Sequence, residues 1–436
     1  SVYREWVDNN PTEFVGFSEL TADAKVLGLV IDGQSVTHAT EGDDVEVILD
    51  VSPLYAESGG QTADRGRLVA EGTILEVTDV QKIGKKLWVH KSKVTAGGID
   101  LGQAVRAEVD AEWRHGARQA HTGTHLIHAA LREVLGPTAV QAGSLNRPGY
   151  LRFDFNYTEQ LTPEQLAEIS TITNQAVDAD FAVNTIETTL DEAKKMGAMA
   201  LFGENYGHDV RVVEIGGPFS IELCGGTHTE HTSQIGPVAV LGESSVGSGA
   251  RRIEAYSGLD SFRHLSKEAA LASGLAASLK SPTEELPERI AALTEKLKAA
   301  EKEIANLHRQ QLASQTGALL DQAVEAGKIT VLTHRLPDGI SGGDLRTVAT
   351  DLRGRLAGKP GVVVLASADG EKLPFIVGAT REAIELGVKS GDLVKLLSGY
   401  VDGRGGGKPD MAQGSGANPA GLDAGFYAVR EELAAL

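Results

Sequence analysis

HTGTH, residues 121–125, lies in the middle of the segment AEWRHGARQAHTGTHLIHAALREVL (111–135), whose apolar residues recur at helical spacing. Gly costs about 1 kcal/mol and each Thr about 0.6 kcal/mol relative to Ala in a helix, so Thr122, Gly123 and Thr124 weaken this turn by about 2 kcal/mol. We therefore expect the helix to contain them for a reason other than its own stability. Because they stand between two histidines, they indicate room for a bound group beside a metal site.

The histidines of this segment indicate half of a metal site. His121 and His125 are four residues apart, so on a helix they point the same way. This spacing alone is a weak signal in a chain with 12 histidines, but the only cysteine, Cys224, also stands four residues before a histidine, His228, in SIELCGGTHTE. One thiolate and three imidazoles are a ligand set that suits Zn²⁺. We predict zinc at these four residues; the competing interpretation is a buried inert thiol with unrelated histidines.

Two further features restrict this prediction. His128 follows His125 by three residues and could compete as a ligand, but we expect it to pack or to support a ligand instead. No Glu follows His121, which excludes the H-E-x-x-H pattern of zincin proteases.

The length and the pattern of the chain predict several domains. A chain of 436 residues exceeds what one core usually organises. We expect a multidomain α+β protein in four parts: a small β-barrel-like domain at 1–108, an α+β domain at 109–260, a helical coiled-coil segment at 261–325 and a C-terminal α/β domain at 326–436. The helical segment has a 4-3 apolar seam at Leu286, Ile290, Leu293, Leu297, Ala300, Ile304 and Leu307. This seam suits an intramolecular helical hairpin or a homodimer.

The charge is unevenly distributed. A net charge of −19 argues against a polyanionic partner for the chain as a whole. Residues 326–436, however, hold 13 Lys plus Arg and 13 Asp plus Glu, so this part is neutral. Within the acidic part, QKIGKKLWVHKSK (81–93) predicts a basic hairpin, which either contacts phosphate or is simply solvated.

Composition also indicates the compartment. No run approaches twenty apolar residues, so we expect no membrane span. A single cysteine excludes a disulfide framework and fits a reducing compartment, for which the cytoplasm is the default. The chain opens with SVYREW, without an initiator Met or a leader, so we expect a fragment of a longer protein.

Several motifs, in order along nearly the whole chain, resemble one family. HTGTH, LNRPGYLRFDF (145–155), FSIELCGGTHTEHTSQIGPVAV (219–240) and GSGARRIEAYSG (247–258) resemble the editing domain of alanyl-tRNA synthetases and their free-standing relatives, whose metal set is H-x-x-x-H with C-x-x-x-H. YAESGGQTADRG (55–66) is similar to the Gly-rich signature of the preceding β domain, and GRGGGKPDMAQGSG (403–416) to the terminal domain. The adenylate-forming motifs of a class II core are absent, so the resemblance implies the C-terminal half of such a synthetase.

The resemblance implies hydrolysis of the ester that wrongly joins serine or glycine to the terminal adenosine of tRNA(Ala), with the C-terminal domain aiding tRNA binding. A pocket made for alanine cannot exclude glycine or strongly reject serine, so a second, hydrolytic site is needed. Two alternatives stay open: a free-standing trans-editing deacylase, and a non-catalytic tRNA-binding module with a structural zinc.

Candidate site residues follow from this reading. Gln141 matches the family's glutamine before a Gly-Ser pair and is a candidate to orient water or substrate, while Thr124 is a candidate to hydrogen-bond a serine hydroxyl. Gly225 and Gly226 would let the backbone approach the ester and stabilise an oxyanion. Candidates for gripping tRNA are Arg251 and Arg252 at the acceptor end, and Arg404 and Lys408 in the Gly-rich stretch. The alternatives are ordinary ones: a surface glutamine, a turn, surface arginines and a flexible loop.

Overall fold

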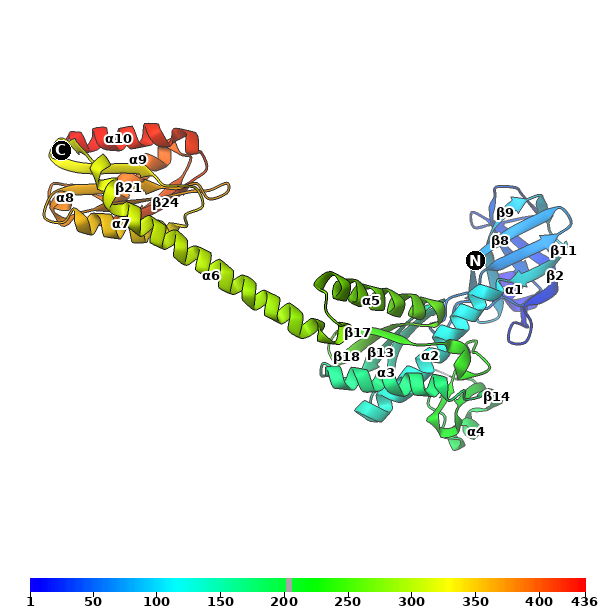
Figure 1. Cartoon of the computed structure of the whole chain (residues 1–436). Coiled ribbons are helices and arrows are strands. Elements are labelled where there is room, and N and C mark those ends of the chain that lie inside the picture. The colour runs from blue at the N-terminus through cyan, green and yellow to red at the C-terminus, as the bar shows by residue number, and fades with distance from the viewer. Residues whose placement is uncertain (201–205) are drawn as a thin grey trace. The chain divides into compact units, whose positions relative to one another are not determined.

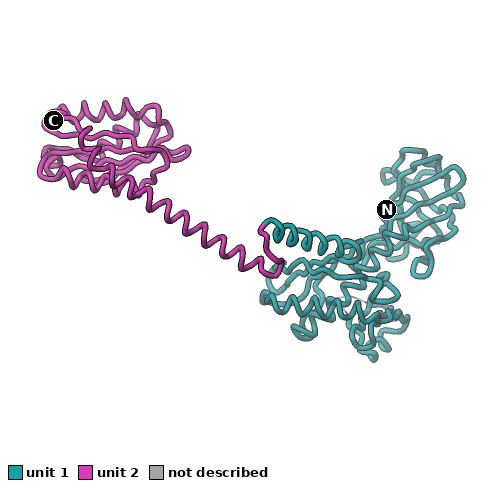
Figure 2. The backbone as a smooth tube through the Cα atoms, in the orientation of Figure 1, with its two compact units in different colours: residues 1–278 teal, residues 279–436 magenta. Residues whose placement is uncertain are grey.

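The structure is a computed structural model that describes residues 1–200 and 206–436. The chain divides into two compact units, residues 1–278 and 279–436 (Figure 2). Both contain sheets and helices, so the predicted mixed, multidomain class is confirmed, whereas the finer four-part division stays a prediction. Across the described residues, none of the helices has the length and apolarity that a membrane span needs.

The first part of unit 1 is a barrel. Its sheet has the order β11-β7-β8-β9-β5-β2-β3, and an additional β11–β2 pairing closes six of the strands into a ring. Inward-facing residues alternate with polar ones along each strand, as a one-sided core requires, and Leu29, Val47 and Leu75 lie inside, fully buried. The strands are β2 (Thr21–Ile31), β3 (Gln34–Val36), β5 (Asp44–Leu49), β7 (Gly66–Ala70), β8 (Thr73–Ile83), β9 (Leu87–Ala96) and β11 (Ala104–Val109).

Beyond the barrel, unit 1 contains two larger sheets that pack with long helices (Figure 1). A four-stranded antiparallel sheet has the order β12-β13-β18-β17, and a three-stranded one has the order β14-β15-β16. The strands are β12 (Gln141–Arg147), β13 (Tyr150–Asn156), β14 (Val183–Thr189), β15 (Asp209–Ile215), β16 (Ser220–Leu223), β17 (Ala239–Ser245) and β18 (Ala250–Tyr256). The longer helices are α2 (Ala111–Leu135), α3 (Pro163–Asp178) and α5 (Gly258–Leu279). One apolar core, with Phe153 and Phe155 fully buried, joins α2 and α3 to the sheets.

Helix α2 is continuous through HTGTH, and its three weak residues are all buried. A Cβ at Gly123 would lie 3.2 Å from Leu151 Cδ2, so a larger residue here would require the Leu151 side chain to shift. The Thr122 hydroxyl accepts a hydrogen bond from Thr229 N at 3.1 Å, and Thr124 donates to Ala120 O at 3.1 Å and contacts the Asn146 amide. Tertiary contacts thus compensate for the low helix propensity of this turn.

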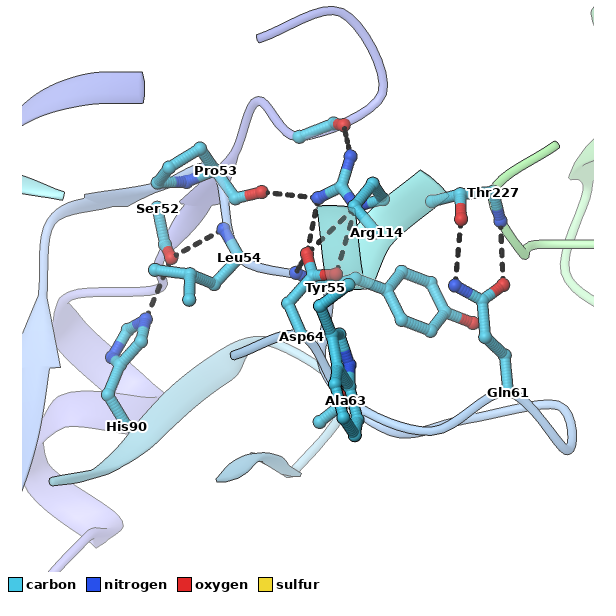
Figure 3. Close-up of polar contacts among 12 residues, drawn as sticks. Ser52, Pro53, Leu54, Tyr55, Gln61, Ala63, Asp64, His90, Arg114 and Thr227 are labelled. Carbon is cyan, nitrogen blue, oxygen red and sulfur yellow. Dashed lines mark hydrogen bonds and ion pairs between the residues drawn. The ribbon is translucent and has the colours of Figure 1, made fainter. Parts of the chain in front are cut away.

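A buried ion pair fixes the start of α2 against the barrel (Figure 3). Arg114 Nε lies 3.0 and 2.9 Å from the two oxygens of Asp64, and its Nη1 and Nη2 donate to Gly16 O at 2.6 Å and Pro53 O at 2.8 Å. Neither side chain is exposed by more than 1%. Both charges of this pair are satisfied, and the guanidinium also bonds to two backbone carbonyls of the barrel region. These contacts hold the start of α2 against the barrel.

Unit 2 contains a long helix and an α/β body. Helix α6 (Leu286–Leu319) precedes a six-stranded sheet of order β19-β20-β21-β22-β24-β23, which packs against helices α7 (Gly342–Arg355), α9 (Ser390–Tyr400) and α10 (Leu422–Ala434). The strands are β19 (Val324–Ala326), β20 (Ile329–Arg335), β21 (Gly361–Ala366), β22 (Leu373–Ala379), β23 (Arg404–Gly407) and β24 (Met411–Gly416). The seam side chains Ile290, Leu293, Leu297, Ile304 and Leu307 are exposed, whereas Leu312 and Leu319 pack on the body of unit 2.

The Gly-rich stretch of unit 2 forms a β-hairpin, β23–β24, instead of the flexible loop that the sequence suggested as one alternative. A Cβ at Gly405 would lie 2.4 Å from Gln413 O, and one at Gly407 would lie 2.6 Å from Ala412 Cα. The glycines are therefore required for close approach of the two strands.

Candidate metal centre

The four predicted ligands meet at one point. The nearest ligand atoms of His121, His125, Cys224 and His228 all lie within 4.8 Å of one another. Cys224 Sγ is 3.4 Å from both His121 Nε2 and His228 Nε2. Tetrahedral zinc, with bonds of about 2.3 Å to sulfur and about 2.0 Å to nitrogen, places these atoms about 3.5 Å apart. The two distances from Cys224 therefore match those of a tetrahedral zinc site.

Local structure brings these side chains together from two parts of the chain. Helix α2 presents His121 and His125 from consecutive turns, with their ring centroids 5.4 Å apart. Cys224 directly follows β16, and the turn Gly225–Gly226 leads to His228. A Cβ at Gly226 would lie 2.1 Å from His121 Cε1, so the turn can reach the helix only with glycine at this position.

Each histidine of the cluster has a polar partner on its other ring nitrogen. His121 Nδ1 lies 2.8 Å from Gln61 Oε1, His125 Nδ1 lies 3.1 Å from Glu222 Oε1, and His228 Nδ1 lies 3.0 Å from Thr122 Oγ1. Gln61 Oε1 is a carbonyl oxygen, so it accepts from His121 Nδ1, which leaves His121 Nε2 free for a metal. The Thr122 hydroxyl accepts from Thr229 N and can either donate to His228 Nδ1 or accept from it.

The electrostatics of the cluster favour the ligating forms of Cys224 and His228. Burial would raise the pKa of the Cys224 thiol, but His121 and His228 outweigh it and hold that pKa well below its usual value. Burial lowers the pKa of His228 to about 3, so its imidazole is neutral. A thiolate and a neutral imidazole are the forms that bind metal.

Glu222 supplies the negative charge beside His125. Burial lowers the pKa of His125, but Glu222 outweighs burial and raises it to about 10. In return, despite its burial, the contacts to His125 and His128 hold the pKa of Glu222 well below its usual value. The Glu222 carboxylate is thus ionised; it is hydrogen-bonded to His128 Nδ1 at 3.1 Å and forms an ion-pair contact with His125 Nδ1 at 3.1 Å.

The donor set fits zinc on two observations of the structure. One thiolate and three imidazoles match its ligand preference, and within the described residues both ring nitrogens of His125 are buried without a hydrogen-bond partner. His128 lies outside the cluster and bonds to Glu222 at 3.1 Å, as expected for a supporting residue.

A cavity of about 520 Å³ opens beside the cluster, within the usual size range of small-molecule sites. Two candidate residues for the reaction, Thr124 and Gln141, line it, and Gln141 Nε2 donates to Ser144 Oγ at 3.1 Å. Gly225 and Gly226 line it as well.

Three family models match separate parts of the chain, and curated relatives align with its whole length. Family models match residues 2–113 (tRNA synthetases class II (A)), 210–254 (threonyl and alanyl tRNA synthetase second additional domain) and 328–435 (DHHA1 domain). The chain is 67% identical to the alanine–tRNA ligase of Corynebacterium glutamicum over 436 residues, 58% identical to that of Nocardia farcinica and 56% identical to that of Mycobacterium avium. The chain belongs to the alanyl-tRNA synthetase family.

The match covers all of this chain but only part of its relatives. The alignments span 100% of the chain and 49% of each of these ligases, so the chain spans about half the length of the alanyl-tRNA synthetases it matches. Among solved structures, the C-Ala domain of the Aquifex aeolicus alanyl-tRNA synthetase is 28% identical over 26% of this chain and 97% of that one, with a TM-score of 0.24.

The other four candidate residues of this alanyl-tRNA synthetase segment lie elsewhere. Arg251 forms an ion pair with Glu243, and Arg252 binds both oxygens of Asp154 at 2.8 and 3.0 Å. Neither arginine lines the cavity beside the cluster. Arg404, on β23, and Lys408, in the turn that follows, are exposed on unit 2. Roles for these four residues in holding tRNA stay predictions.

Apart from His128, the residues that support the site were not predicted from the sequence. Gln61 lies in the motif SGGQTADRG, which resembles the family signature, but the motif does not say what the glutamine contacts. Glu222 had a usable signal, because it stands two residues before Cys224 and alternate residues of a strand share a face. Lys82 and Lys85 of the basic hairpin also line the cavity. The net charge of the whole chain had given no indication of this local positive charge.

Proposed function

We propose that this chain is the editing part of an alanyl-tRNA synthetase, which hydrolyses the ester of tRNA(Ala) mischarged with serine or glycine. The observation that supports this best is the gathering of His121, His125, Cys224 and His228 at the wall of a cavity of about 520 Å³. Such a cavity is large enough for an aminoacyl group with part of its nucleoside. The family match to the second additional domain supports the same function.

The four ligands would hold Zn²⁺, which when bound would supply a positive charge beside the ester carbonyl. Thr124 offers a hydroxyl at the cavity wall that would pair with the hydroxyl of serine. Alanine has no group for this contact, which favours serine by the value of one buried hydrogen bond, about 1 to 3 kcal/mol. Gln141 would orient water or substrate, and the backbone of Gly225 and Gly226 would approach the carbonyl oxygen closely.

The proposed partners follow from the same reading. They are tRNA(Ala), the catalytic half of the synthetase, and a second copy of this chain through the exposed apolar seam of α6. Unit 2, matched by the DHHA1 model, would aid tRNA binding. We retain the cytoplasm as the expected compartment.

The test is deacylation of serine-charged alanine tRNA by the zinc-loaded chain. We expect wild type to release serine, and Cys224→Ala and Gln141→His to lose most of this activity while still binding tRNA. Alanine-charged tRNA is the control substrate and should be spared. Zinc-loaded wild type that binds tRNA but leaves the serine ester intact would refute the proposal and favour a non-catalytic binding module.

A further inference from the structure

A second cavity of unit 1, of about 720 Å³, adjoins the one beside the metal cluster. The two cavities share part of their lining, so they lie next to each other. The shared residues are Tyr55, Lys82, Asp209, Val210, Arg211 and Gly225.

The wall of the second cavity alternates aromatic rings and cations. The Arg211 guanidinium lies 3.9 Å from the centroid of the Phe17 ring, and Lys82 Nζ lies 5.1 Å from that of Trp88. Phe14 stacks on Trp88 at 5.5 Å with 16° between the planes, and contacts Phe17 edge-on at 5.1 Å. Phe17 is 41% exposed although it belongs to this aromatic group. Rings interleaved with cations are the surface that single-stranded nucleic acid prefers.

The charge of this wall is also unusual for the chain. Lys82 is held close to Lys85 and, within the described residues, neither forms an ion pair, on a protein with a net charge of −19. Partial burial and then the charge of Lys85 lower the pKa of Lys82, and an incoming anion would offset the repulsion between the two lysines. Glu187 and Asp209 also line the cavity and can accept hydrogen bonds from the amino group of a base. Trp88 Nε1 is buried and has no acceptor among the described residues.

We propose that this second cavity binds the single-stranded nucleotide that precedes the aminoacylated adenosine, with its base on Phe17 and Phe14 and its phosphate between Lys82 and Arg211. The assignment rests on the proposed function, because it takes the ester to lie at the metal cluster. Continuity with the metal cavity decides for a nucleotide over an apolar peptide, since the ligand must cross the shared cationic residues.

Two variants test this proposal, Phe17→Ala and Lys82→Ala, each assayed on two substrates. We expect the KM for serine-charged alanine tRNA to rise about tenfold in each, with little change in kcat, because one stacked base or phosphate contact is lost. Hydrolysis of the seryl ester of adenosine alone, which has no preceding nucleotide, should not change in Phe17→Ala, because Phe17 lines only the second cavity. Leu101→Ala and Lys93→Ala are matched controls, because both residues are exposed on the barrel and line neither cavity. An unchanged KM for the tRNA, or equal losses on both substrates, would overturn the proposal.

A binding measurement separates this proposal from the proposed function. Saturation-transfer NMR with the uncharged trinucleotide CCA needs no hydrolysis, and it reports which base protons touch the protein. We expect transfer to the cytosine beside the adenosine in wild type and its loss in Phe17→Ala. If wild type shows this transfer but hydrolyses no ester, the proposed function fails and the nucleotide site stands. Absent transfer, or transfer that Phe17→Ala leaves unchanged, contradicts the nucleotide site.

Discussion

The substitution Gln61→Ala should weaken metal binding, although Gln61 is not one of the four ligands. Gln61 is fully buried in the loop between the barrel strands and makes three hydrogen bonds across to the metal cluster. Its Oε1 accepts from His121 Nδ1 at 2.8 Å and from Thr227 N at 2.9 Å, and its Nε2 donates to Thr227 Oγ1 at 2.7 Å (Figure 3 shows the Thr227 contacts). The same loop pairs with β12, where Asn146 N donates to Gly60 O at 2.7 Å and Thr62 N donates to Asn146 O at 2.9 Å.

The magnitude follows from these contacts. Removing the amide leaves the Nδ1–H of His121 and the N–H of Thr227 buried without an acceptor, which costs about 1 to 3 kcal/mol for each group. Loss of the orienting partner of a ligating histidine weakens metal binding by about 10- to 100-fold. We therefore expect the zinc Kd of Gln61→Ala to rise by that factor and the metal-free chain to be less stable by about 2 kcal/mol or more.

Competition with a chromophoric chelator measures the zinc Kd, and urea unfolding of the metal-free chain measures the stability. Gln61→Glu should recover much of the affinity, because a carboxylate still accepts from His121. Gln103→Ala is the control, since Gln103 also accepts a backbone N–H in the barrel, from Asp100 at 2.9 Å, but is remote from the cluster. If Gln61→Ala lowers stability and leaves the zinc Kd unchanged, the tautomer of His121 does not depend on Gln61 and the reasoning fails.

Arg114→Met strands the buried Asp64 carboxylate and should destabilise unit 1 by about 3 to 5 kcal/mol in urea unfolding; a loss below about 1 kcal/mol would contradict the pairing. Burial lowers the pKa of His90 to about 4 from an ordinary 6.5, so below pH 6.5 the unfolded chain takes up a proton that the folded chain does not. The free energy of unfolding should therefore be highest above pH 6.5 and fall by about 3 kcal/mol toward pH 4; His90→Gln should lack this part of the slope, and equal slopes would refute it. Gly226→Ala should push the turn away from His121 and raise the zinc Kd more than Gly225→Ala does, because a Cβ at Gly225 meets open space; equal effects would count against the steric argument.

The metal cluster could be predicted from sequence because each half of it is local. His121 and His125 are related by one helical turn, Cys224 and His228 by one short loop, and the lone cysteine limited the choices. Only the proximity of the two halves depends on the tertiary structure, which shows that their ligand atoms lie close together.

The supporting shell could not be predicted, because its members come from distant parts of the chain. Gln61 is 60 residues from His121, and Glu222 is 94 from His128. Propensity and periodicity report local backbone preferences and say nothing about such pairs. The low helix propensity of HTGTH did predict a reason beyond the helix, but the structure shows packing of Gly123 on Leu151 and hydrogen bonds of Thr122, and of the three residues Thr124 lines the cavity.

A basic run and a pair of glycines show in another way what sequence patterns leave open. The run 81–93 was correctly seen as basic, yet only Lys82 and Lys85 line the cavity, while Lys91 and Lys93 on β9 are exposed away from its lining. Gly405 and Gly407 were compatible with a flexible loop as well as with a strand, because sequence does not distinguish flexibility from close approach of strands.

X-ray absorption at the zinc edge of the metal-loaded chain tests the central claim most directly. We predict one zinc per chain with one sulfur at about 2.3 Å and three nitrogens at about 2.0 Å, and loss of the sulfur in Cys224→Ser. Zinc bound without sulfur, or a Cys224→Ser spectrum identical to that of wild type, would show that these four residues do not form the metal site.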